Sequence, residues 1–171
     1  FMGGLARLCC QKGWNVTGSD QHVYPPMSDQ LRDAGIVLHE GFDTSVLTDD
    51  LDMVVIGNAM SRGKPVIEAV LDRKIPFVSG PELLGRLTTD MTVLAVSGTH
   101  GKTTTTSLIA TIFQKTKLDP TIINGGVINS LKNSAKLGKS DWSILEADES
   151  DGSFIHIPPT YSIITNIDRE H

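Results

Sequence analysis

The residues best suited to chemistry form one continuous run, Gly98-Thr99-His100-Gly101-Lys102-Thr103-Thr104, between an apolar segment and a segment of helical pattern. A loop between a strand and a helix points successive backbone N–H groups and the positive end of the helix dipole at one place, which suits a polyphosphate. Lys102 adds a positive charge for the outer phosphates, and the Thr103 hydroxyl can ligate a phosphate-bound magnesium ion. The run therefore predicts a site for ATP and Mg²⁺.

The spacing of this loop differs from that of the commonest phosphate loop, which would place a glycine at position 96, where this chain has Val96. The alternative is a glycine turn that joins a strand to a helix and binds nothing. The strand-like residues 93–96 and the helix-like residues after the loop favour the phosphate site, because the motif requires that context.

Polar residues also follow two later apolar runs. Residues 146–151, Glu-Ala-Asp-Glu-Ser-Asp, come after the run 142–145, and residues 166–171, Asn-Ile-Asp-Arg-Glu-His, come after the run 161–165. Open parallel sheets bind ligands beyond the carboxyl ends of their strands, so we expect both segments to converge on the loop. The four carboxylates of residues 146–151 repel one another unless they are solvated or near cations. A metal site is the favoured interpretation, and a solvated acidic turn is the alternative.

Composition limits the class of protein. The chain has 171 residues, of which 39% are hydrophobic and 20% charged, and this indicates neither disorder nor a membrane span. The formal net charge of −5 argues against broad nucleic-acid binding.

Cys9 and Cys10 are adjacent on an expected helix, where their side chains diverge, so we expect two unpaired, buried thiols. No signal peptide is visible, so we expect a cytoplasmic protein, and the start at Phe1 suggests a truncated N-terminus.

Apolar runs and helical patterns alternate along the whole chain, which predicts an α/β fold with parallel, doubly wound sheets. The polar residues Thr88-Thr89-Asp90 mark a boundary between a domain at 1–89 and a second domain at 90–171. Strands are expected at 14–18, 36–39, 53–56, 77–79, 93–96, 120–123, 142–145 and 161–165, and helices at 5–12, 28–34, 64–73, from Pro81, and at 102–115.

Four segments together carry a resemblance to a known family: residues 98–106, Asn124-Gly125-Gly126, residues 146–151, and residues 165–171. The chain resembles the Mur ligase family over nearly its whole length. The resemblance implies a Rossmann-like N-terminal domain that binds UDP-N-acetylmuramate and the start of a central ATP-binding domain. It also implies that a C-terminal acceptor domain is absent here, and that this fragment is inactive by itself.

The resemblance further implies a reaction in peptidoglycan biosynthesis. The γ-phosphoryl group of ATP passes to the substrate carboxylate, and this phosphoryl transfer requires alignment and charge neutralisation. An amine then attacks the acyl phosphate. By resemblance, the catalytic residues are Lys102, Glu146 and His171, and Mg²⁺ is held by Thr103, Glu146 and His171. Residues 98–104 and Asn166 would bind ATP. His171 by itself is weak evidence for a magnesium site, because imidazole is an unusual ligand for Mg²⁺.

Residues at expected strand ends in the first half are candidates for the UDP moiety. They are Ser19-Asp20 and Asn58-Ala59-Met60-Ser61, together with Gly3 and Gly4, which look like the tail of a glycine-rich loop. Ordinary turn chemistry is the alternative for each of them. This half could also pass for a nicotinamide-binding fold, but the complete G-x-G-x-x-G fingerprint is not present.

The two halves resemble different branches of the family. The first half, with residues 23–28 and 57–63, is similar to members that recycle a murein tripeptide; the second half, with residues 123–126 and 146–154, is similar to members that add L-alanine. In the recycling branch, a tyrosine would be expected at the position that Ser150 occupies in this chain. Both branches use the same UDP-muramate donor, so the resemblance implies the same donor and reaction type in either case. L-alanine is the favoured acceptor, and the tripeptide is the alternative.

Two other classes of function remain open. A non-catalytic module would bind ATP to switch a partner, and a phosphate-loop kinase could use Asp148 or Glu149 to accept a hydroxyl proton. Neither explains a Rossmann-like domain ahead of the loop.

Overall fold

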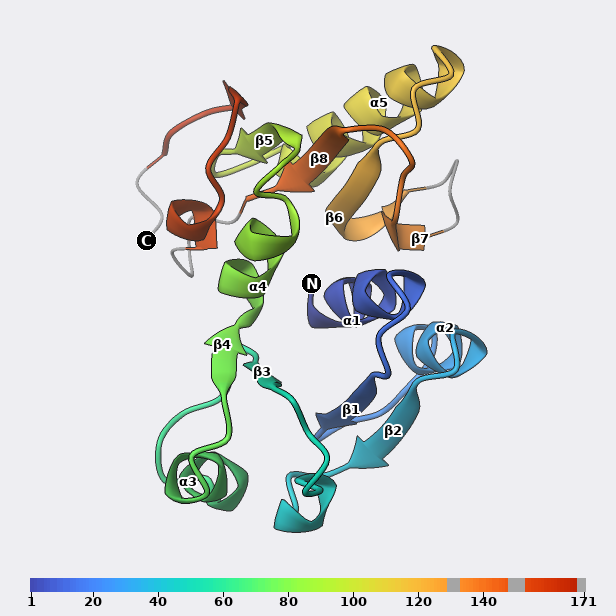
Figure 1. The fold of residues 1–171 in the computed structure, drawn as a ribbon. Coiled ribbons are helices and arrows are strands. Elements are labelled where there is room, and N and C mark those ends of the chain that lie inside the picture. The colour runs from blue at the N-terminus through green and yellow to red at the C-terminus, as the bar shows by residue number, and fades with distance from the viewer. Residues whose placement is uncertain (129–132, 148–152, 169–171) are drawn as a thin grey trace.

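The computed structural model describes residues 1–128, 133–147 and 153–168. The first half alternates helices and strands, as expected (Figure 1). The strands pair in parallel as β1 with β2 and β3 with β4. The bounds are α1 Met2–Gln11, β1 Thr17–Asp20, α2 Met27–Asp33, β2 Val37–Glu40, η1 Thr44–Val46, β3 Val54–Ile56, α3 Pro65–Asp72, β4 Phe77–Ser79 and α4 Gly80–Leu87.

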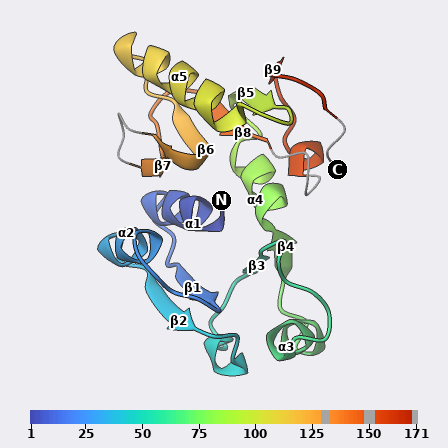
Figure 2. The same ribbon diagram turned by 180° about the vertical axis from the view of Figure 1, so that it is seen from behind.

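The second half is built on a single five-stranded sheet in the order β7-β6-β8-β5-β9. All neighbours are parallel except β6 and β7, which pair antiparallel. In two opposite views, α5 lies along this sheet (Figures 1 and 2). The bounds are β5 Thr92–Ser97, α5 Lys102–Lys115, β6 Thr121–Ile128, β7 Asn133–Lys136, β8 Trp142–Glu146, η2 Ser153–His156 and β9 Tyr161–Ile164. The α/β class with parallel sheets is confirmed.

Two local expectations were wrong. The strand expected from Trp14 begins only at Thr17, because the chain first reverses at Gly13, which adopts a positive φ of 88°, and the Trp14 N–H bonds back to the Cys9 carbonyl at 3.2 Å. Strand β7 was not expected, since its sequence Asn-Ser-Ala-Lys contains no β-branched or aromatic residue. Tertiary packing forms this strand instead.

Helix α1 of the first half packs directly on β7 of the second. A Cβ at Gly4 would stand 3.1 Å from the Ala135 Cβ, so the two elements approach closely. The Arg7 guanidinium donates to the Asn133 side chain, and the Gln11 side chain accepts from the Leu137 N–H at 2.8 Å. The two halves are therefore joined by specific contacts as well as by burial.

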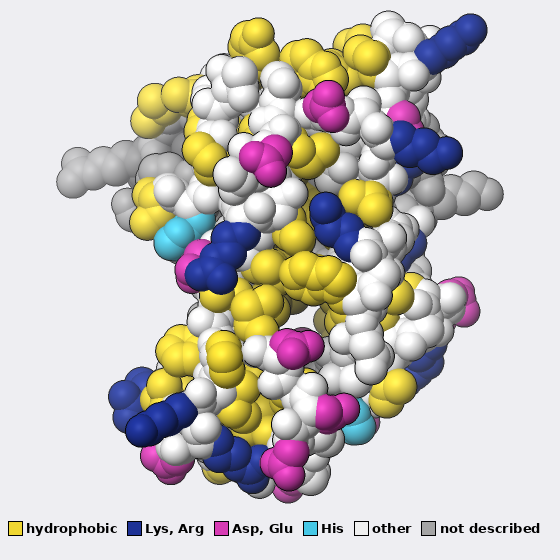
Figure 3. Space-filling view, viewed as in Figure 1, with side chains coloured by type: hydrophobic (Ala, Val, Ile, Leu, Met, Phe, Trp, Pro, Cys, Tyr) yellow, Lys and Arg dark blue, Asp and Glu magenta, His cyan; other side chains and the backbone are white. Residues whose placement is uncertain are grey.

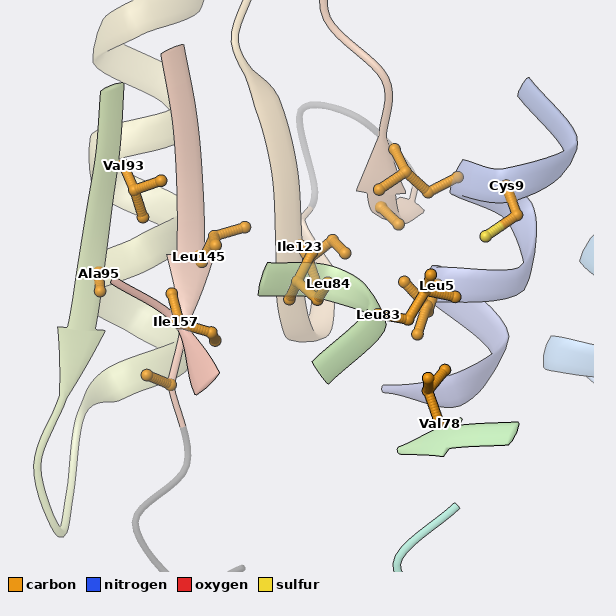
Figure 4. Packing of buried hydrophobic residues seen from close by; sticks show 13 residues of the cluster. Leu5, Cys9, Val78, Leu83, Leu84, Val93, Ala95, Ile123, Leu145 and Ile157 are labelled. Atoms are coloured by element: carbon orange, nitrogen blue, oxygen red, sulfur yellow. The ribbon is translucent and has the colours of Figure 1, made fainter. Parts of the chain in front are cut away.

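One hydrophobic cluster runs through both halves. It combines residues of α1 and α4 with residues of β5, β6 and β8 (Figure 4). In the space-filling view, hydrophobic side chains gather at the middle of the molecule, over α1 and α4 (Figure 3). The boundary expected at residues 88–90 falls between α4 and β5 and stays a prediction. The cluster comprises Leu5, Leu8, Cys9, Val78, Leu83, Leu84, Val93, Ala95, Ile123, Ala135, Leu145, Ala147 and Ile157.

Both cysteines are free thiols, as expected. Cys9 is buried, and burial raises the pKa of its thiol. Cys10 is only partly buried, so the expectation of two buried thiols was wrong for this residue; its Sγ donates to the Ala34 carbonyl at 3.1 Å. Among the described residues, no helix combines the length and the apolar character that crossing a membrane requires.

Candidate active site

The loop between β5 and α5 has the geometry expected of a phosphate site. Gly98 and Gly101 adopt φ angles of 125° and 81°, which residues with a Cβ rarely adopt, and Gly101 is the N-cap of α5. The first N–H groups of the helix have no acceptor within it and are directed beyond its end. The Lys102 ammonium donates to the Gly98 carbonyl at 2.6 Å, so its charge lies over the loop.

Glu146 lies at the carboxyl end of β8 and joins three elements. One carboxylate oxygen, Oε1, accepts from the Thr103 hydroxyl at 2.9 Å. The other, Oε2, accepts from the Gly125 N–H at 2.6 Å. These bonds connect β8 to the first turn of α5 and to β6. Within the described residues, these two hydrogen bonds leave two of the four lone-pair positions of the carboxylate unused.

Strand β6 contributes residues that the sequence analysis quoted for the resemblance but did not place in the site. A Cβ at Gly125 would stand 2.9 Å from Glu146 Oε2, so a larger residue here would require the carboxylate to shift. Asn124 is 2% exposed and donates to Ser107 Oγ at 3.1 Å and to the Gly126 carbonyl at 2.9 Å. Its buried Oδ1 has no hydrogen-bond partner among the described residues. An Asn-Gly-Gly sequence directly after the strand expected at 120–123 was the signal available for finding them.

The end of β9 adds two more polar residues to the loop. The Asn166 side chain accepts from the His100 N–H at 2.9 Å and donates to the His100 carbonyl at 3.0 Å. The Thr165 hydroxyl donates to the same His100 carbonyl at 2.6 Å. Asn166 is thus brought to the loop as expected, although its side chain meets the backbone. The carboxyl ends of β5, β8 and β9 and the middle of β6 therefore converge around the start of α5.

The metal-ligand expectation is described only in part. His171 and the carboxylates Asp148, Glu149 and Asp151 lie outside the described residues, as does Ser150. Within residues 1–128, 133–147 and 153–168 there is no group of three histidine, cysteine, aspartate or glutamate side chains able to hold a metal. The Thr103 hydroxyl and the Glu146 carboxylate supply oxygen donors, which are the ligands that Mg²⁺ prefers.

The candidate UDP residues lie at three places in the first half. Gly3 and Gly4 stand in the first turn of α1, Ser19 and Asp20 end β1, and Asn58-Ala59-Met60-Ser61 follow β3. The Ser19 hydroxyl donates to the Gly41 carbonyl, and Asp20 Oδ1 accepts from the His22 N–H at 3.1 Å. Ser19 therefore links the end of β1 to the residue that follows β2, and Asp20 stabilises the local turn after β1. Gly4 also has a packing role, because it faces β7.

A cavity of about 380 Å³ lies elsewhere, between α1, α2 and the start of β7. Its lining contains none of the residues expected to bind ATP or the UDP moiety. It is lined by Arg7, Cys10, Gln11, Gln30, Asp33, Ala34 and Asn133.

Comparison with known families agrees with this arrangement. Residues 1–91 match the family described as "Mur ligase family, catalytic domain", and residues 96–171 match "Mur ligase middle domain". The chain belongs to the Mur ligase family. The loop of residues 98–104 lies wholly within the part that matches the middle domain.

Two curated relatives represent the two branches. The chain is 51% identical over 175 residues to the UDP-N-acetylmuramate--L-alanine ligase of Pelagibacter ubique. It is 46% identical over 179 residues to the UDP-N-acetylmuramate--L-alanyl-gamma-D-glutamyl-meso-2,6-diaminoheptandioate ligase of Escherichia coli. These matches cover 99% and 100% of this chain but only 36% and 39% of those Mur ligases.

Solved structures of Mur ligases have the same fold. The UDP-N-acetylmuramate:L-alanyl-gamma-D-glutamyl-meso-diaminopimelate ligase from Neisseria meningitides matches all of this chain and 58% of its own, with a TM-score of 0.95 and 38% identity. The UDP-N-acetylmuramate-alanine ligase from Thermotoga maritima matches 99% of this chain and 40% of its own, with a TM-score of 0.91 and 26% identity.

Proposed function

We propose that this chain is the donor-binding and ATP-binding part of a ligase that joins L-alanine to UDP-N-acetylmuramate. The observation that carries the proposal is the convergence of Lys102, Thr103 and Glu146 at the carboxyl edge of the five-stranded sheet. Membership of the Mur ligase family supports the same chemistry. We further propose that residues 1–89 bind the donor, that residues 90–171 bind ATP, and that the enzyme works in the cytoplasm.

In the proposed mechanism the loop holds the triphosphate while the donor carboxylate attacks the γ-phosphorus. A P–O bond forms to the carboxylate, and the bond to the leaving ADP breaks. Lys102 stabilises the charge of the transferring group, and the N–H groups at the start of α5 bind the phosphate oxygens. The amine then attacks the acyl carbon, and inorganic phosphate leaves.

Thr103 and Glu146 would hold Mg²⁺, with His171 helping to hold a second ion. Bound there, Mg²⁺ supplies charge neutralisation to the phosphate oxygens. The chemistry of the donors fits this role, because a carboxylate and a hydroxyl meet beside the phosphate loop. Gly98, Thr99, His100, Gly101 and Thr104 complete the proposed ATP site, with Asn166.

The donor would lie across the strand ends of the first half. Gly3, Gly4, Ser19, Asp20 and residues 58–61 are the proposed contacts with the UDP moiety. They lie at the start of α1, at the carboxyl end of β1 or just after β3, and open α/β sheets bind nucleotides at the carboxyl ends of their strands.

The recycling of a murein tripeptide is the second candidate function. The structural match to the Neisseria enzyme favours it, since both the TM-score and the identity exceed those of the Thermotoga alanine ligase. The identity of 51% to the Pelagibacter relative favours L-alanine instead.

The test is phosphate release from the complete protein with ATP, Mg²⁺ and UDP-N-acetylmuramate. L-alanine is compared with L-Ala-γ-D-Glu-meso-diaminopimelate as acceptor. Release with L-alanine would support the first candidate, and release with the tripeptide alone would support the second. ATP binding without phosphate release under either condition would favour a non-catalytic module.

A further inference from the structure

The chain continues to run beside the phosphate loop after strands β5 and β9 have ended. Strands β5 and β9 are parallel neighbours, with Ser97 opposite Ile164. Beyond that pair, the Thr165 N–H donates to the Ser97 carbonyl at 3.0 Å, and the Thr99 N–H donates to the Asn166 carbonyl at 3.2 Å. Residues 98–100 therefore follow a path that residues 165–166 define.

Two side chains then bind one residue of the loop. The Asn166 side chain accepts from the His100 N–H at 2.9 Å and donates to the His100 carbonyl at 3.0 Å. The Thr165 hydroxyl has one proton and lies 2.6 Å from that carbonyl, against 3.2 Å from the Ser97 carbonyl. Both backbone groups of His100 are thus engaged by residues far away in the sequence.

The contact also explains why position 98 is glycine. A Cβ on Gly98 would collide with the Thr165 hydroxyl and would stand 2.8 Å from the Asn166 carbonyl oxygen. On its other side the Gly98 carbonyl accepts from the Lys102 ammonium at 2.6 Å. The loop is therefore held between β9 and the first residue of α5.

We propose that Thr165 and Asn166 are positioning residues, which set the orientation of the phosphate loop through the backbone of His100. Because these hydrogen bonds order the loop before the nucleotide binds, the loop loses less conformational entropy on binding. This inference rests on the proposed function, because it requires the loop to bind the phosphates of ATP. It changes the expected role of Asn166 from a nucleotide contact to a support of the loop.

The test compares three ligands on variants of the complete protein: MgATP, inorganic tripolyphosphate and adenosine. Thr165→Val removes the hydroxyl at nearly constant shape, and Asn166→Ala removes both amide bonds. We expect each variant to bind MgATP and tripolyphosphate about tenfold more weakly, as the loss of one or two hydrogen bonds implies. We expect adenosine, measured by ligand-observed NMR, to bind as it does to the wild type.

Two controls make the result specific. Thr165→Ser keeps the hydroxyl and should restore wild-type binding of tripolyphosphate. Thr160→Val removes a bond of similar length, from the Val93 N–H to Thr160 Oγ1 at 3.1 Å, just before the start of β9, and should leave binding of all three ligands unchanged. Urea midpoints of all variants separate loss of the fold from loss of the loop.

Three results would overturn the inference. Asn166→Ala could weaken adenosine as strongly as ATP, which would make Asn166 a nucleotide ligand. Thr165→Val and Asn166→Ala could bind tripolyphosphate like the wild type, or Thr165→Ser could be as weak as Thr165→Val. A wild type that binds no MgATP at all would instead overturn the proposed function.

Discussion

Replacing Glu146 by glutamine separates the structural work of this carboxylate from its proposed role as a metal ligand. Both of its partners are donors in the structure, the Thr103 hydroxyl at 2.9 Å and the Gly125 N–H at 2.6 Å. A glutamine can keep its oxygen on the Gly125 N–H and turn its NH₂ toward Thr103, whose hydroxyl oxygen can also accept. Both hydrogen bonds survive, but the negative charge is lost.

The expected magnitudes follow from this geometry. For Glu146→Gln the free energy of unfolding should change by less than about 1 kcal/mol, because no polar group is left without a partner. Glu146→Ala strips the acceptors from both donors and should cost about 1–3 kcal/mol. The Mg²⁺ concentration for half-maximal phosphate release should rise at least about 10-fold in the glutamine variant, as expected for damage to a metal site.

The assays are urea unfolding of the three proteins and Mg²⁺ titration of phosphate release in the complete enzyme. An unaltered Mg²⁺ requirement in Glu146→Gln would refute the assignment of Glu146 as a metal ligand. A loss of stability in Glu146→Gln equal to that of Glu146→Ala would refute the hydrogen-bond reasoning, because it would mean that the glutamine cannot serve both donors.

Three further predictions concern other parts of the molecule. Lys102→Ala should abolish phosphate release while UDP-N-acetylmuramate binding, measured by calorimetry, stays close to that of the wild type; unchanged turnover would remove Lys102 from the mechanism. Gly85→Ala should destabilise the fold by at least about 1–3 kcal/mol in urea unfolding, because the His156 carbonyl oxygen occupies the space of the new Cβ, and a wild-type midpoint would contradict that packing. Hydrogen bonds from the Arg62 side chain lower the pKa of Glu68 from 4.5 to about 2. The contribution of this ion pair to stability is therefore present above pH 4.5 and is lost as the pH falls toward 2. In Arg62→Ala, NMR titration should show the pKa of Glu68 return toward 4.5, and an unchanged pKa would exclude Arg62 as the cause.

Local pattern was sufficient for most elements of the fold. Helix α5 has the bounds expected from the sequence, Lys102–Lys115, although four consecutive threonines at 103–106 favour a helix poorly. Its start is set by Gly101 and by tertiary contacts such as the burial of Thr106, which is 0% exposed. Strand β7 could not be predicted in this way, because its stability comes from α1 and β6.

The sequence by itself determined the proposed phosphate loop, residues 98–104, and its position between a strand and a helix. Its parts are consecutive in the chain, so glycine conformation, the lysine charge and the helix dipole act on one place whatever the rest of the fold does. The sequence also predicted that residues 146–151 and 166–171 would converge on the loop, and only the tertiary structure decided which atoms meet there. Thr103 meets Glu146 across 43 positions and His100 meets Asn166 across 66, and such pairs depend on the order and register of strands in the sheet. Strand register is set by packing throughout the core, so no local spacing in the sequence encodes those contacts.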